Sequence, residues 1–159
     1  MLTPLIKTAL TLYRVHQDIQ ATIFCRIVAS DPDDGFNFIF EKYKATPIEN
    51  PVKARLLNAL ACSNDHDTLQ KLLDMTLDLN SGIDSTHAVT AIQRVAMNSR
   101  GRALVLDFLQ KNLQRIITVT GGGINSVLSI VSTLASNRST QKYLDKVCKS
   151  NLNLKHNYY

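Results

Sequence analysis

Apolar residues recur every three or four positions along almost the whole chain, and no segment shows the strict alternation that marks a β-strand. Each run predicts one amphipathic helix, because positions three or four apart lie on the same side of a helix. The predicted helices carry their apolar stripes at residues 2–13, 23–28, 36–43, 52–60, 69–76, 88–95, 105–116, 124–134 and 144–148. The pattern therefore predicts an all-α protein of about nine helices.

Residues that start or stop helices separate these stripes. Asp31 precedes Pro32 and Asn50 precedes Pro51, so each pair offers a capping side chain followed by a proline suited to the first helical turn. The glycines of TGGG, residues 120–123, end one helix and permit a tight turn into the next. Because these connections are short, we expect neighbouring helices to run antiparallel.

A weak internal repeat indicates how the helices are arranged. The segments SDPDDGFNFIFEKY (30–43) and SNDHDTLQKLLDMT (63–76) align at an offset of 33, with apolar residues at matching positions. Helix pairs that repeat at this length are typical of an α-solenoid, in which each pair packs only against its neighbours. We therefore predict a single helical-repeat domain over residues 1–159, built as an α-solenoid rather than a compact bundle. Its predicted core contains Phe36, Phe40, Leu56, Leu60, Leu73, Ile92, Phe108 and Leu128.

The composition is that of an ordinary globular protein, with 45% hydrophobic and 19% charged residues. No apolar run approaches the roughly 20 residues that a membrane span needs, and the N-terminus reads as an amphipathic helix rather than a signal peptide. The net charge of +5 would suit an acidic partner. The Lys and Arg residues are scattered singly and form no basic arm, however, which argues against nucleic-acid binding.

The residues that carry chemistry form no catalytic or metal-binding motif. The four histidines never approach the His-x-x-x-His spacing that places two ligands on one helix face. Asp65 and Asp67 flank His66 at a predicted helix start, where capping is a better interpretation than metal binding. The segment TGGGINS (120–126) lacks the preceding strand and the following lysine of a phosphate-binding loop. We therefore expect no cofactor and no catalysis from this chain alone.

The three cysteines leave more than one interpretation open. Cys148 continues the apolar stripe of its helix, as a small buried residue would. Cys25 and Cys62 lie on two predicted helices separated by one intervening helix, and such helices pack alongside each other in a helix-pair solenoid. That arrangement could bring the two sulfurs together. The residues alone do not pair them, because three cysteines allow three different single bridges.

Four successive segments resemble the C-terminal domain of the M1-family zinc aminopeptidases, and most of all the animal membrane ectoenzymes of the aminopeptidase N type. They are ATIFCRIVASDPDDGFNFIFEKYKAT (21–46), KARLLNALACSNDHDTLQKLLDMTLD (53–78), AVTAIQRVAMNSRGRALVLDFLQKNLQRI (88–116) and GGGINSVLSIVSTLASNRSTQKYLDKV (121–147). The likeness runs in unbroken order from about residue 10 to residue 148. It implies a bowl of HEAT/ARM-like helix pairs that packs against a catalytic domain, closes over the active site and limits which peptides enter.

The resemblance also implies a setting and partners. In the resembled enzymes the zinc motif, His-Glu-x-x-His with a distant Glu, lies in a separate upstream domain, and this chain lacks the motif. Zinc is thus implied for the catalytic domain of a parent aminopeptidase, and not for this chain. The implied partners are that catalytic domain and, in the intact enzyme, a peptide substrate. The chain would be part of a larger C-terminal domain in an extracellular or membrane-anchored ectodomain.

Particular residues acquire roles from the same resemblance. It implies a disulfide between Cys25 and Cys62, which needs an oxidising compartment, and leaves Cys148 as a free thiol. In that compartment the sequon NRS, residues 137–139, would allow glycosylation of Asn137. Five cations are candidates for attracting a peptide's C-terminal carboxylate if they face the bowl: Lys53, Arg55, Arg94, Arg102 and Arg115.

Three functions therefore compete at this level. The first, which we favour, is a non-catalytic accessory domain of a zinc aminopeptidase. The second is a free-standing α-solenoid that binds another protein through its concave face. The third is a helical repeat that binds nucleic acid, which would need a basic stripe along successive helices and would bind less tightly as salt rises.

Overall fold

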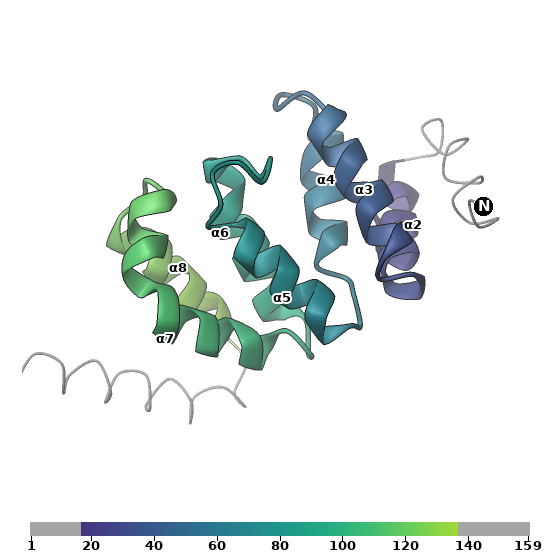
Figure 1. The fold of residues 1–159 in the computed structure, drawn as a ribbon. Helices are drawn as coiled ribbons and strands as arrows, with labels where there is room; N and C mark the ends of the chain where they lie inside the picture. The colour runs from purple at the N-terminus through teal and green to yellow at the C-terminus, as the bar shows by residue number, and fades with distance from the viewer. Residues whose placement is uncertain (1–16, 137–159) are drawn as a thin grey trace, which may run out of the picture.

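The structure, a computed structural model, describes residues 17–136, and these residues form seven helices and no strand (Figure 1). The helices are α2 (Gln17–Ser30), α3 (Asp34–Ala45), α4 (Pro51–Leu60), α5 (His66–Met75), α6 (Ser85–Met97), α7 (Arg102–Val119) and α8 (Ile124–Ala135). They correspond one to one with the seven stripes predicted between residues 23 and 134. The stripes predicted at 2–13 and 144–148 lie outside the described residues. The prediction of an all-α protein is confirmed.

The helices form two layers along the array. In one layer α2 packs on α4, α4 on α6 and α6 on α8. In the other, α3 contacts both α2 and α4, α5 contacts α6 and α7, and α7 also contacts α6 and α8. The main contacts of each helix are thus with the next helix or the next but one, as in an α-solenoid (Figure 1).

Local side chains fix where several helices begin. The Asn50 side chain accepts the backbone N–H of Val52 at 2.9 Å, and Pro51 is the first residue of α4. The Asp65 carboxylate accepts the backbone N–H of Thr68 at 2.8 Å at the start of α5. That hydrogen bond lowers the pKa of Asp65 from its ordinary value, since it favours the charged form. Asp65 therefore acts as a helix cap, as its position in the sequence predicts.

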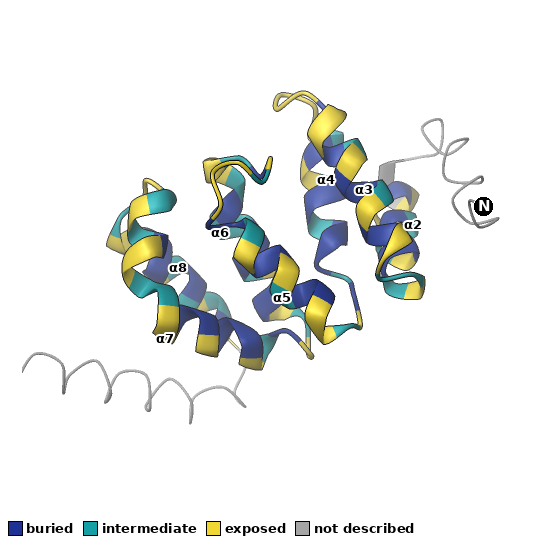
Figure 2. Ribbon diagram, in the orientation of Figure 1, coloured by how far each residue is buried: buried dark blue, intermediate teal, exposed yellow. Residues whose placement is uncertain are grey.

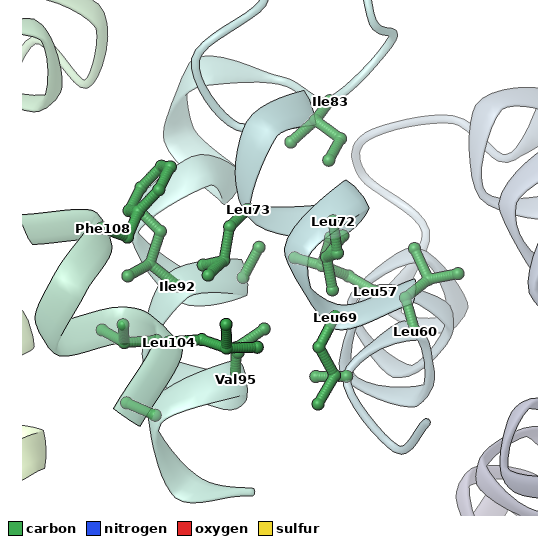
Figure 3. Close-up of a cluster of buried hydrophobic side chains, with 14 of the residues drawn as sticks. Leu57, Leu60, Leu69, Leu72, Leu73, Ile83, Ile92, Val95, Leu104 and Phe108 are labelled. Atoms are coloured by element: carbon green, nitrogen blue, oxygen red, sulfur yellow. The ribbon is translucent and has the colours of Figure 1, made fainter. Parts of the chain in front are cut away.

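The core lies between the layers, where buried side chains of neighbouring helices meet (Figure 2). The matching positions of the internal repeat are all buried: Phe36, Ile39 and Phe40 on α3, and Leu69, Leu72 and Leu73 on α5. In Figure 3 the leucines of α5 lie between those of α4 and the apolar residues of α6 and α7. The two copies of the sequence repeat therefore bury side chains at corresponding positions.

The prediction of the core is wrong for one residue, Leu128. Leu128 is 57% exposed, whereas the other seven predicted core residues are buried. Helix α8 buries Val127, Ile130 and Leu134, and these lie on a different side of the helix from Leu128. The helical spacing showed that Leu128 belongs to an apolar stripe, and α8 has two such stripes.

Candidate functional site

A disulfide joins the first two helices of one layer. Cys25 lies within α2, and Cys62 lies two residues beyond Leu60, the last residue of α4. Because α2 and α4 pack side by side, the two Cα atoms are 5.2 Å apart, within the usual range for a bridge. This is the pairing that the family resemblance implied. Cys148 lies outside the described residues.

Beside the disulfide lies a pocket of about 580 Å³ between α2, α4 and α6. Its wall includes both cysteines, Arg55 of α4, and Arg94 and Met97 of α6. The Arg55 guanidinium donates to the Gln20 side-chain oxygen at 3.3 Å, and Arg94 is exposed. Two of the five candidate cations therefore line a single pocket.

The wall of this pocket is held in place by Asn98, directly after α6. Its side-chain amide donates to the carbonyl oxygens of Ala61 at 2.8 Å and Ser63 at 2.9 Å. These two carbonyls flank Cys62 in the chain, so the turn that carries the disulfide is tied to the end of α6. Asn98 was not singled out from the sequence, because its partners lie 35 and 37 residues earlier.

The electrostatic character of the pocket follows from the helices around it. Helices α4 and α6 contain no acidic residue, whereas α2, the third helix around the pocket, contains Asp18. In the other layer, α3, α5 and α7 each carry Asp or Glu as well. A carboxylate is the kind of group that such an arginine pair can bind by charge-assisted hydrogen bonds.

The other three candidate cations lie elsewhere. Arg102 and Arg115 are on α7, in the opposite layer, and an Arg115 nitrogen donates to the Leu77 carbonyl at 3.4 Å. Lys53 is only 7% exposed. Its ammonium lies 3.0 Å from the Thr46 carbonyl and 3.3 Å from the Asp84 carboxylate, so it is engaged inside the fold.

Lys53 belongs to a polar cluster that sequence reasoning missed. The Tyr43 hydroxyl lies 3.2 Å from the Asp84 carboxylate and 2.9 Å from His87 Nδ1, and the Lys53 ammonium lies 4.6 Å from the centre of the Tyr43 ring. Burial raises the pKa of Tyr43 well above its ordinary value, so the phenol stays neutral and serves as a hydrogen-bonding group. The cluster ties α3 and α4 to the start of α6. No local signal reveals it, since Tyr43 is 41 and 44 residues from its partners.

Removing the negative charge of the Lys53–Asp84 pair should destabilise the protein more than removing the positive charge. We expect Asp84→Ala to lower the free energy of unfolding by about 2 kcal/mol, since it leaves a buried ammonium with the Thr46 carbonyl and the Tyr43 ring but no carboxylate. Lys53→Met should cost less than about 1 kcal/mol, because the remaining Asp84 side chain is 43% exposed and can be hydrated. Urea unfolding of the two variants measures the difference. A larger loss for Lys53→Met would show that the pair is not organised around a buried cation.

Three further points concern metal binding, membrane spanning and glycosylation. Within residues 17–136 no group of three or more His, Cys, Asp or Glu side chains is placed to hold a metal ion. No helix in that same range is long and apolar enough to cross a membrane. Asn137, the predicted glycosylation site, lies just outside the described residues.

Comparison with known proteins identifies the fold's family. Residues 6–150 match the family model of the ERAP1-like C-terminal domain. The chain belongs to this family. The match confirms the resemblance to the C-terminal domain of M1 aminopeptidases, which the four sequence segments carried.

Relatives of this ERAP1-like C-terminal domain are larger enzymes. The chain is 28% identical over 139 residues to aminopeptidase N of Oryctolagus cuniculus, covering 87% of this chain and 14% of that protein. It is 27% identical over 135 residues to aminopeptidase N of Homo sapiens, covering 84% and 14% respectively. It is also 27% identical over 140 residues to the thyrotropin-releasing hormone-degrading ectoenzyme of Rattus norvegicus, covering 86% and 13%. The ERAP1-like domain thus spans about one seventh of the length of these relatives.

Proposed function

We propose that this chain is the non-catalytic C-terminal domain of a zinc aminopeptidase of the M1 family, and that it packs against the catalytic domain and restricts the access of peptides to the active site. The match of residues 6–150 to the ERAP1-like C-terminal domain carries the proposal. Relatives named aminopeptidase N and an ectoenzyme support peptide substrates and an extracellular or membrane-anchored setting. Zinc would be held by the catalytic domain. The Cys25–Cys62 disulfide fits an oxidising compartment.

Within this function the pocket between α2, α4 and α6 attracts the free C-terminal carboxylate of a peptide. Arg55 and Arg94 both line it, so two cationic side chains from neighbouring helices border one pocket. Arg102 and Arg115 lie in the other layer, and Lys53 is buried and paired, so the proposal rests on two of the five candidate cations. The domain acts by shape and charge, without chemistry of its own.

The sequence of the transcript that encodes this chain tests the assignment as a domain of a larger enzyme. We expect the messenger RNA that encodes this chain to encode His-Glu-x-x-His upstream in the same reading frame, since the relatives are about seven times longer than the aligned segment. A transcript that encodes only this domain, with no zinc motif in frame, would contradict the proposal. It would favour the free-standing protein-binding solenoid instead.

Enzyme kinetics test the pocket. In the intact aminopeptidase, Arg94→Gln should raise KM for short peptides with a free C-terminal carboxylate by about three- to ten-fold. An increase of this size is expected because the variant loses one exposed charge-assisted hydrogen bond to the carboxylate. The same peptides with an amidated C-terminus should be cleaved as before. Arg115→Gln, a matched change on α7, should leave both substrates unaffected. Equal losses for the free and amidated peptides would exclude carboxylate recognition by Arg94.

A further inference from the structure

The Cys25–Cys62 disulfide lies at the wall of a pocket rather than inside the core. Both cysteines line the pocket of about 580 Å³ between α2, α4 and α6, and neither residue is fully buried. The apolar neighbours of the cysteines in the chain are enclosed, since Phe24 is 3% exposed and Leu60 is completely buried. A bridge whose sulfurs no thiol can reach is inert, whereas a bridge at the wall of a pocket can be attacked by a dissolved thiol.

The charges around the pocket favour such an attack. Among the described residues that line the pocket, the charged ones are Arg55 and Arg94, and both are positive. The attacking species in thiol–disulfide exchange is a thiolate, so negative charge is spread over the sulfurs as the bonds change. Two guanidinium groups at one pocket therefore assist both the approach of a negatively charged thiol and the exchange itself.

We propose that the Cys25–Cys62 bridge is a site of thiol exchange for small thiols that carry carboxylates. The thiolate of such a molecule attacks the Cys62 sulfur and forms a mixed disulfide. The Cys25–Cys62 bond breaks, and its electron pair leaves on the Cys25 sulfur, which takes a proton from water. A second thiolate attacks the small molecule's sulfur in the mixed disulfide and releases Cys62 in the same way. The bridge is thereby reduced to two thiols, and the two small molecules are oxidised to one disulfide.

The position of each cysteine on its helix decides which sulfur is attacked. Cys62 lies just beyond the C-terminal end of α4, and its sulfur is 3.8 Å from the Asn58 carbonyl oxygen. Negative charge is disfavoured there, both by that oxygen and by the negative end of the helix dipole. Cys25 lies inside α2, away from either end of that helix. Cys25 is therefore the better leaving thiolate, and the incoming thiol becomes attached to Cys62.

The surrounding fold does not depend on the bridge alone. Helices α2 and α4 also pack against each other, and both contribute buried apolar side chains to the core. Asn98 holds the turn on both sides of Cys62 through the carbonyl oxygens of Ala61 and Ser63. Exchange therefore needs no global unfolding. Its product is a folded chain in which the wall of the pocket carries two thiols in place of a cross-link, with or without a catalytic domain attached.

Reduction by thiols of different charge tests the proposal on the full chain. Glutathione is anionic, 2-mercaptoethanol is neutral and cysteamine is cationic. Each rate is divided by the rate at which the same thiol reduces hydroxyethyl disulfide, which removes differences in intrinsic reactivity. After this correction, glutathione should open the bridge about three- to five-fold faster than 2-mercaptoethanol, and cysteamine should be the slowest of the three. Salt at about 0.5 M should reduce these differences by screening the arginines. Mass spectrometry of acid-quenched samples measures the rates.

Two arginine variants provide the control. Arg94→Gln should lower the corrected rate for glutathione by about two- to three-fold and leave the rate for 2-mercaptoethanol unchanged. Arg115→Gln, on α7, should change neither rate. Circular dichroism should stay native during the exchange, and the trapped mixed disulfide should map to Cys62. Equal corrected rates for the three thiols would overturn the proposal. Opening of the bridge only as fast as the chain unfolds globally, or glutathione trapped on Cys25, would overturn it as well.

Discussion

Unfolding the double variant Cys25→Ala/Cys62→Ala should require about 3 to 4 kcal/mol less free energy than unfolding the native chain. The bridge spans 37 residues, and closing a loop of that length in the unfolded chain removes roughly this much conformational entropy. For a domain of this size the loss corresponds to a fall of about 10 °C in Tm. Urea titration and thermal melting, each followed by circular dichroism, measure the change.

Thiol counting provides the control for this prediction. Denatured, unreduced protein should contain one free sulfhydryl, that of Cys148, and Cys148→Ser should remove it without the loss of stability. Three free sulfhydryls would contradict the bridge. An equal loss of stability from Cys148→Ser would show that the effect comes from buried sulfur rather than from the cross-link.

Leu72→Ala should destabilise the protein by about 3 kcal/mol, as expected for a large-to-small change at a fully enclosed position. Leu72 is completely buried and lies among the leucines of α4 and α5 in Figure 3. The loss combines the apolar surface returned to water with the cavity left behind, because the helices around it are fixed by their other contacts. Urea unfolding reports the free energy, and native circular dichroism verifies that the helices remain.

Leu79→Ala is the matched control, since Leu79 is 75% exposed in the connection between α5 and α6. Its effect should be within about 0.5 kcal/mol of zero. If the two substitutions lowered the free energy of unfolding equally, the burial of Leu72 would not be the source of its contribution to stability. A loss for Leu72→Ala below 1 kcal/mol would argue equally against a rigid core.

Local signals predicted the helices well because each signal acts over a few residues. The Asn50–Pro51 pair starts α4 where expected, and the spacing of Phe36, Ile39 and Phe40 marks the buried face of α3. The Cys25–Cys62 pairing came from the family resemblance, since the residues by themselves left three bridges open.

Features that depend on distant partners could not be predicted in this way. Lys53 looked like a surface cation, because a lysine in a sequence carries no sign that Asp84 and the Thr46 carbonyl will enclose it. Leu128 looked like a core residue, because periodicity cannot tell which of two apolar stripes meets the rest of the chain. Of the five candidate cations, only the packing of α4 against α6 could single out Arg55 and Arg94.

The disulfide also changes what a protease can do to this domain. The connection between α3 and α4 is exposed at Pro47, Ile48 and Glu49, the kind of segment where chains are nicked. A cut there falls between Cys25 and Cys62, so the two pieces remain covalently joined. Their buried faces stay at high effective concentration and can hold the fold together. On a denaturing gel without a reducing agent, a nicked molecule would therefore run as one band. After reduction it would run as two fragments.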